Sequence, residues 1–297
     1  MIEGIHILLT YDCTLECNHC FLHCGPHAGG TFRLDQICAL LDQAIELGTV
    51  TSVCFEGGEP VVYYSLLLEC VRQARIRDLG VGIVTNAYWA TSVEDAELVL
   101  RPLHEAGLDH VTMSDDALHY GAEAGKHRLR VEEAANRLGM TVSVISVEAP
   151  TVIGATDESP AKVSGSVMFR GRAAERMTAG LPTRPWDTLS SCPRERLDSP
   201  GRVHVDCFGS VHLCQGLLMG NLWETPLKQL VAKFDPHADP IVGPILRGGP
   251  AALVRAHDLS HSEGYVDECH LCYSARQEMR RQGNQASLGP AQAYGIA

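Results

Sequence analysis

Short apolar runs alternate with helical segments between residues 5 and 169 of the 297-residue chain, and this alternation constrains the fold more than any other feature. The helical segments carry apolar residues three or four positions apart and end at a glycine, as at Gly48 and Gly139. Strands that alternate with helices form parallel βαβ units, so the pattern predicts an α/β fold. Six strand-like runs are present, at residues 5–9, 50–55, 80–84, 110–113, 141–147 and 166–169.

Six such units are too few for the closed eight-stranded barrel, which favours an open, partial (β/α)6 TIM-like barrel over residues 1–175. Residues 176–200 are rich in proline, arginine, serine and threonine, and we expect them to be a linker. A smaller second domain is expected over residues 201–282. The tail, residues 283–297, has little reason to be ordered.

The second domain is expected to be a small β-hairpin and helix unit. Two short alternating segments flank Phe208-Gly209-Ser210, which is a hairpin signal. The stretch 235–250 is rich in proline and glycine and is expected to be loop, and a last short helix is expected after Cys272.

Unusual polar residues follow each predicted barrel strand. In parallel α/β folds the active residues collect at the carboxyl ends of the strands. We therefore expect these segments to meet at one mouth of the barrel. They are the cysteine loop at 13–20, Gly57-Gly58-Glu59-Pro60, Thr85-Asn86, Ser114-Asp115-Asp116 and Arg170-Gly171-Arg172.

Three cysteines, Cys13, Cys17 and Cys20, lie within eight residues of the loop after the first strand. Three thiolates so close together are typical of a metal site. A [4Fe–4S] cluster held by three cysteines keeps one iron free of protein ligands, and an open coordination position indicates chemistry. Zinc is the alternative, with His19, His23 or Cys24 completing the ligand set.

The other cysteines and the charge restrict the class of protein further. Most of the 12 cysteines form close groups at 13–24 and 192–272, and no export signal precedes them. This arrangement indicates metal-binding thiols in the reducing cytoplasm, whereas Cys38, Cys54 and Cys70 are expected to be core thiols. The net charge of -12 argues against nucleic acids and anionic membranes as partners.

The spacing of the three cysteines resembles that of the radical S-adenosylmethionine (SAM) superfamily. The resemblance implies that the triad holds a [4Fe–4S] cluster and that one SAM molecule binds beside it. His19 then takes the place of the residue next to the adenine, and Arg170 that of a residue meeting the SAM carboxylate. The remaining SAM contacts implied are Gly57, Gly58, Glu59 and Pro60 for the amino group, Asn86, and Ser114 and Asp116 for the ribose.

The second half is similar to the SPASM/twitch group, whose C-terminal extension holds auxiliary iron–sulfur clusters. Gly209 with Cys214 five positions on matches the hairpin cysteine of that group. The cysteine count implies the shorter twitch version with one auxiliary cluster, on Cys192, Cys214, Cys269 and Cys272. Cys207 is surplus to this set, and a structural zinc ribbon is the alternative for the region.

The resemblance implies reductive cleavage of SAM to a 5′-deoxyadenosyl radical that takes a hydrogen atom from a substrate. A flavodoxin- or ferredoxin-type reductant is then the expected electron source. His119 and Tyr88, on predicted loops at the mouth, are candidate catalytic residues. We expect a ribosomally made peptide or a protein as substrate, with a small metabolite as the alternative. A zinc-binding regulatory module and a cluster protein that only transfers electrons are the competing classes.

Overall fold

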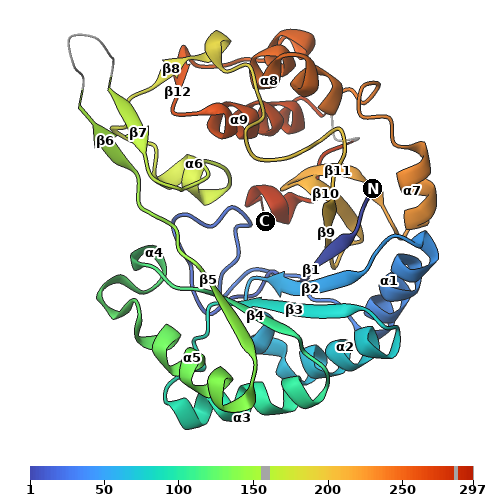
Figure 1. Ribbon diagram of the computed structural model, residues 1–297. Coiled ribbons are helices and arrows are strands. Elements are labelled where there is room, and N and C mark those ends of the chain that lie inside the picture. Colours follow the sequence, from blue (N-terminus) through green and yellow to red (C-terminus); the bar gives the residue numbers. More distant parts are fainter. Residues whose placement is uncertain (155–160, 284–286, 297) are drawn as a thin grey trace.

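The computed structural model describes residues 1–154, 161–283 and 287–296 (Figure 1). Its centre is an eight-stranded sheet with the strand order β11-β10-β9-β1-β2-β3-β4-β5. Strands β1 to β5 and β9 run parallel, and β10 and β11 complete an antiparallel hairpin. The strands are β1 Gly4–Thr10, β2 Ser52–Gly57, β3 Gly80–Thr85, β4 His110–Ser114, β5 Thr141–Ile145, β9 Arg202–Asp206, β10 Ser210–Cys214 and β11 Leu217–Asn221.

Four long helices cover the outer side of strands β1 to β5 (Figure 1). Their ends are set locally: Gly48 takes a left-handed conformation after α1, and the Ser92 side chain accepts a hydrogen bond from the Asp95 amide at the start of α3. Each helix buries one apolar face, and the predicted α/β alternation is confirmed. The helices are α1 Leu34–Leu47, α2 Tyr64–Ile76, α3 Val93–Glu105 and α5 Lys126–Leu138.

The sixth strand predicted at residues 166–169 is wrong. This segment has no strand conformation in the described structure, and Val167 and Phe169 instead pack against Val266 in a separate small core. Before it, β6 (Thr151–Ile153) and β7 (Lys162–Ser164) form a two-stranded sheet of their own. The sixth parallel strand is β9, which pairs with β1 on the side away from β2.

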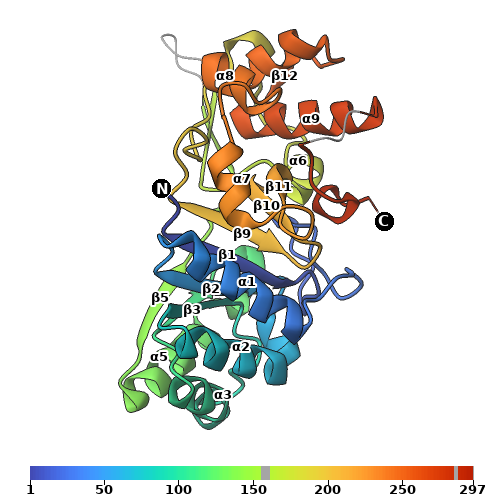
Figure 2. The ribbon, with the colours of Figure 1, turned by 90° about the vertical axis from the view of Figure 1, so that its right-hand side faces the viewer.

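The C-terminal helices α8 and α9 lie at the opposite end of the molecule from α2 and α3, with the strands between them (Figure 2). The loop prediction for residues 235–250 is wrong in its second part, because α8 begins at Val242. Asp239 Oδ1 accepts the amide hydrogens of Ile241 and Val242, at 2.9 and 2.7 Å, and the backbone departs from helical geometry only at Gly248 and Gly249. The helices here are α7 Leu227–Lys233, α8 Val242–His257 and α9 Glu268–Arg281.

Short elements connect these parts. Cys269 and Cys272 lie inside α9 rather than before a helix. The remaining helical elements are η1 Pro60–Tyr63, α4 Ala117–Tyr120, η2 Gly121–Glu123, α6 Arg172–Arg176, η3 Trp186–Thr188 and η4 Ala291–Tyr294, and the remaining strands are β8 Arg184–Pro185 and β12 Gly264–Tyr265. Among the described residues, every helix is too short or too polar to cross a membrane.

The tail is ordered where the structure describes it, contrary to expectation. Leu288, Ala293 and Tyr294 are buried, and the Tyr294 ring stacks on Tyr273 of α9 at 5.7 Å between centroids. Residues 284–286 and 297 lie outside the described residues. The division of the chain at residues 176–200 stays a prediction, since one sheet contains strands from both sides of it.

Candidate active site

A cavity of about 820 Å³ lies along one face of the sheet and is lined by residues from both the amino and the carboxyl ends of its strands. Most of the predicted site residues meet here. Glu59, Pro60, Asp116 and Tyr88 are outside the set of described residues that line the cavity. The predicted residues that line it are Cys13, Cys17, His19, Cys20, Gly57, Gly58, Asn86, Ser114, His119 and Arg170.

The cysteine loop is held by backbone hydrogen bonds and by one arginine. The amide of Cys13 donates to the Gly25 carbonyl at 3.2 Å. Arg172, which is almost fully buried, donates from Nε to the Cys17 carbonyl at 3.0 Å and from its guanidinium to the Cys24 carbonyl. This role of Arg172 was not predicted from the sequence, although Arg172 belongs to the predicted Arg170-Gly171-Arg172 segment.

Only glycine fits at positions 57 and 58, because the backbone of residues 10–12, at the end of β1, passes close to both. A Cβ on Gly58 would lie 2.0 Å from the Asp12 carbonyl oxygen, and one on Gly57 would lie 2.3 Å from that of Thr10. The amide of Gly58 donates to the Thr10 carbonyl at 2.7 Å. The two glycines therefore fix the cysteine loop against the end of β2 and leave bare backbone on the cavity wall.

Glu59 is buried and does not line the cavity. Its carboxylate accepts hydrogen bonds from Thr85 Oγ1 at 2.8 Å, from the Asn86 amide at 2.7 Å and from the Val61 amide at 3.0 Å. Burial raises its pKa from the ordinary 4.5 to about 7, although these donors favour the charged form. Glu59 thus joins the ends of β2 and β3, and through Asn86 it fixes a side chain that does line the cavity.

The three thiols suit a cationic metal cluster. A hydrogen bond with the Cys24 thiol lowers the pKa of Cys20 to about 6, whereas burial raises the pKa of Cys13 to about 11 and that of Cys17 to about 12, because a buried thiolate lacks compensating positive charge. Metal binding supplies that charge and deprotonates the thiols. Moreover, His19 Nδ1 and Arg170 Nε are buried without a hydrogen-bond partner among the described residues, as donors and acceptors that await a bound molecule would be.

His119 and His19 stand together beside the cysteine loop. Their rings meet edge to face at 4.5 Å, and His119 Nδ1 lies 2.9 Å from Asp116 Oδ1. Asp116 also accepts the amide hydrogen of Val147 at 2.9 Å, so it orients His119 and ties the segment after β5 to the site. Tyr88, half-buried, lies behind Asn86, whose Oδ1 accepts its amide hydrogen.

A polar group that the sequence analysis missed lines the same cavity further from the cysteine loop. It consists of His6 on β1, Glu56 on β2 and His204 on β9, with Cys54 beside them. The prediction that Cys54 is a core thiol is therefore wrong, since its side chain faces a cavity. In the sequence, His6 and His204 stand out only as histidines flanked by apolar residues in two separate segments. The pairing of β1 with β9 is what places them opposite each other.

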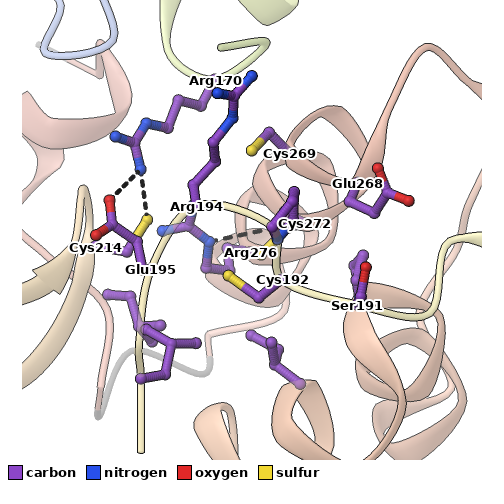
Figure 3. A pocket seen from close by; sticks show the side chains of 15 residues that line it. Arg170, Ser191, Cys192, Arg194, Glu195, Cys214, Glu268, Cys269, Cys272 and Arg276 are labelled. Carbon is purple, nitrogen blue, oxygen red and sulfur yellow. Dashed lines mark hydrogen bonds and ion pairs between the residues drawn. The ribbon is translucent and has the colours of Figure 1, made fainter. Parts of the chain in front are cut away.

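Four cysteines surround a second, much smaller cavity of about 30 Å³ (Figure 3). These are the cysteines predicted to hold an auxiliary cluster, Cys192, Cys214, Cys269 and Cys272. Arg170 lines both cavities, and its guanidinium donates to Cys214 Sγ at 2.7 Å and lies 3.4 Å from Glu195.

Cys207 lies elsewhere. It is buried, and a Cβ on Gly30 would lie 2.8 Å from its sulfur, so Cys207 packs against the loop after β1. It is not among the described residues that line the second cavity.

Comparison with known proteins agrees with the geometry. Residues 7–163, just over half of the chain, match the radical SAM superfamily model. A stretch of 161 residues is 31% identical to GTP 3′,8-cyclase 2 of Mycobacterium tuberculosis and covers 50% of this chain and 43% of that protein. Another, of 118 residues, is 30% identical to the tungsten-containing aldehyde ferredoxin oxidoreductase cofactor-modifying protein of Pyrococcus furiosus, covering 39% and 32% of the two chains.

A more distant match is YydG of Bacillus subtilis, whose name assigns it to peptide biosynthesis; it is 21% identical over 117 residues, 39% of this chain and 37% of that protein. The chain thus spans only 32% to 43% of the length of these relatives. Among solved structures, BtrN in complex with AdoMet and 2-DOIA superposes with a TM-score of 0.47 at 15% identity, over 77% of this chain and 82% of that one. The match over residues 7–163 shows that the chain belongs to the radical SAM superfamily, whose enzymes use a [4Fe–4S] cluster and SAM.

Proposed function

We propose that this protein is a radical SAM oxidoreductase that takes a hydrogen atom from a peptide or protein substrate and carries an auxiliary iron–sulfur cluster. The observation that carries the proposal is the pair of adjoining thiol-lined cavities, which share Arg170. One contains the three-cysteine loop and enough volume for a cofactor and a substrate group, and the other contains four cysteines.

The chain's own residues prepare the first site for its cofactors. Cys13, Cys17 and Cys20 would hold the cluster, and the loop that carries them is fixed by Arg172. When bound, the cluster and SAM supply a 5′-deoxyadenosyl radical, and the protein contributes binding, orientation and exclusion of water. The cavity-facing groups available to SAM are the backbone at Gly57 and Gly58 and the side chains listed with them, His19, Asn86 and Ser114.

The second cavity supports a twitch-type auxiliary cluster. Cys192, Cys214, Cys269 and Cys272 come from three separate segments and offer the four thiolates that a [4Fe–4S] cluster takes. Burial raises the pKa of Cys272 to about 11, as it does for Cys13 and Cys17 of the first site. Arg170 places a buried positive charge at Cys214, which would stabilise an anionic cluster. The site lies beside the larger cavity, so we infer that it passes electrons or binds substrate.

The substrate class rests on weaker support. The likeness to YydG favours a peptide or protein, modified as in the maturation of ribosomally made peptides. A small polar metabolite, oxidised or rearranged, is the second candidate. It is favoured by the polar side chains of His6, Glu56 and His204, which line the interior of the cavity where a compact molecule would lie.

The chemistry and the second cluster are tested with protein purified without oxygen. We expect roughly eight irons per chain, as two cubanes contain, and dithionite-dependent formation of 5′-deoxyadenosine from SAM. Cys17→Ala should abolish SAM cleavage. Cys269→Ser should lower the iron content to about half and leave the spectrum of the SAM-binding cluster intact. Cys38→Ser serves as the matched control, because Cys38 is a half-buried cysteine on α1, and it should keep the wild-type iron content. Intact SAM cleavage in Cys17→Ala would overturn the assignment of the first site, and unchanged iron in Cys269→Ser that of the second.

Substrate class is tested by deuterium transfer. Candidate peptides and metabolites encoded or made by neighbouring genes are incubated in deuterated form with SAM and a flavodoxin- or ferredoxin-type reductant. Deuterium in 5′-deoxyadenosine from a peptide supports the first candidate, and deuterium from a metabolite alone would replace it with the second.

A further inference from the structure

A group of metal-ligating side chains lies in the large cavity, apart from both sets of cysteines assigned to clusters. His6, Cys54 and Glu56 each offer one ligand atom, and these nitrogen, sulfur and oxygen atoms all lie within 4.8 Å of one another. None of the three was assigned a role in the proposed reaction. Their proximity needs a separate explanation.

Strand pairing brings the group together. In the parallel register His6 of β1 lies opposite Cys54 of β2 on one side and opposite His204 of β9 on the other. Side chains two positions apart on a strand share a face, so Glu56 points the same way as Cys54. All four side chains line the cavity, which makes them reachable by a ligand bound there.

The carboxylate of Glu56 is held from both sides. His6 Nδ1 lies 2.8 Å from Oε2, and His204 Nδ1 lies 2.8 Å from Oε1, while the two imidazole rings are 4.9 Å apart. Glu56 is mostly buried, with 15% of its side chain exposed. The two histidines hold its pKa well below the usual range, so the group carries a buried negative charge.

We propose that His6, Cys54 and Glu56 bind one zinc ion, with His204 orienting the Glu56 carboxylate through its second oxygen. Zinc takes nitrogen, sulfur and carboxylate ligands together. Three protein ligands with a fourth position open to a cavity are the arrangement of zinc sites that bind substrate or water. A carboxylate oriented by a second hydrogen bond is the usual support for such a ligand.

The neighbouring strand leaves space for the fourth ligand. Gly82 of β3 lies opposite Cys54 and lines the cavity, and even a methyl group there would meet the Cys54 sulfur only at 3.7 Å. A substrate donor such as a carboxylate, a thiolate or an alkoxide fits this position. The zinc ion would then anchor the substrate in the cavity whose other end holds the cysteine loop.

The test measures zinc and iron together in anaerobically purified holoprotein. We expect Glu56→Gln and Cys54→Ser each to lose one zinc per chain and to keep the wild-type iron content. Cys38→Ser, a cysteine of similar exposure on α1 outside the cavity, should lose neither metal. His204→Gln should keep the site but weaken its zinc affinity by about 10- to 100-fold, as changes to supporting residues do.

The zinc X-ray absorption edge reports ligand type without interference from iron. We expect one sulfur at about 2.3 Å and lighter ligands at about 2.0–2.2 Å, a pattern that Glu56→Gln should remove. Equal zinc in wild type, Glu56→Gln and Cys54→Ser would overturn the proposal, as would a wild-type zinc spectrum with sulfur ligands only. Iron content and 5′-deoxyadenosine formation test the proposed function separately, so a failure of the zinc proposal can be distinguished from a failure of the proposed function.

Discussion

Replacing Gly58 by alanine is expected to displace the cysteine loop. The added Cβ would lie 2.0 Å from the carbonyl oxygen of Asp12 and 2.6 Å from its carbonyl carbon. Both are backbone atoms, which cannot rotate aside as the end of a flexible side chain does. Contacts under 3.0 Å are essentially never adopted, so the Asp12 carbonyl must retreat by at least 1 Å or the end of β2 must move by as much.

This shift falls on the residue before Cys13, the first of the proposed cluster ligands. Asp12 precedes Cys13 directly, and its carbonyl accepts the amide hydrogen of Glu59 at 2.8 Å. Metal–ligand distances tolerate only about 0.2 Å, and a misplacement of about 1 Å in a catalytic arrangement costs about 10²-fold in rate. Overpacking also costs about 1–3 kcal/mol of folding free energy. We expect the variant to fold, with weakened cluster binding and at least a 10²-fold loss of SAM cleavage.

The assay is the rate of 5′-deoxyadenosine formation, read beside iron content and urea unfolding of the same preparation. Gly29→Ala is the control, since Gly29 lies in the segment between β1 and α1 that also carries the three cysteines, and a Cβ there would meet nothing within 4 Å. It should behave as wild type. A Gly58→Ala variant with wild-type iron content and wild-type SAM cleavage would refute the reasoning.

Three further predictions concern the surroundings of the site. Tyr294→Ala should lower the free energy of unfolding by about 3–5 kcal/mol, because it empties a buried aromatic position. A loss below about 1 kcal/mol in urea titrations would contradict the packing of the tail against α9. Between pH 4.5 and about 7 the folded protein keeps a proton on Glu59 that the unfolded chain has released. The free energy of unfolding should therefore fall by about 3 kcal/mol as the pH rises through this range. Glu59→Gln should flatten that slope in unfolding titrations at pH 5 to 8, and parallel wild-type and variant curves would refute it. Arg172→Ala removes the buried donor to the Cys17 carbonyl and should speed iron release to a chelator at least tenfold. Arg176→Ala, which removes a partly exposed arginine, should leave the release rate unchanged. Equal release rates in the two variants would contradict the role of Arg172.

Elements set by local interactions were predictable from the sequence. Helix α5 ends directly before Gly139 as predicted, because its apolar spacing and this glycine define it without help from distant residues. The proximity of the three cysteines was predictable for the same reason, since Cys13, Cys17 and Cys20 lie on one short loop. Most of the residues that follow β1 to β4 met as expected, because parallel strands place their carboxyl ends at one edge of the sheet. Arg170 and Arg172 also line the cavity, although residues 166–169, which lead into them, do not form a strand.

Features that depend on pairing between distant segments were not predictable. The run 166–169 is as apolar as a strand, yet its buried side chains pack on Val266, and β9 takes the sixth parallel position instead. His6 and His204 are nearly 200 residues apart, and only the β1–β9 register makes them neighbours of Glu56. The direction of Glu59 also escaped prediction, since the motif fixes its position and the donors around it fix its side chain.

The place of β1 in the sheet has a consequence for how the chain folds during synthesis. Strand β1 lies between β2 and β9. One row of its backbone hydrogen-bonding groups therefore has no partner until residues 202–206, which form β9, have left the ribosome. Contacts of such long sequence separation form slowly, and an unpaired strand edge invites pairing with other chains. A chain halted before β9 therefore keeps the cysteine loop on a strand with an open edge. Pairing of β9 with β1 is the step that we expect to separate productive folding from aggregation.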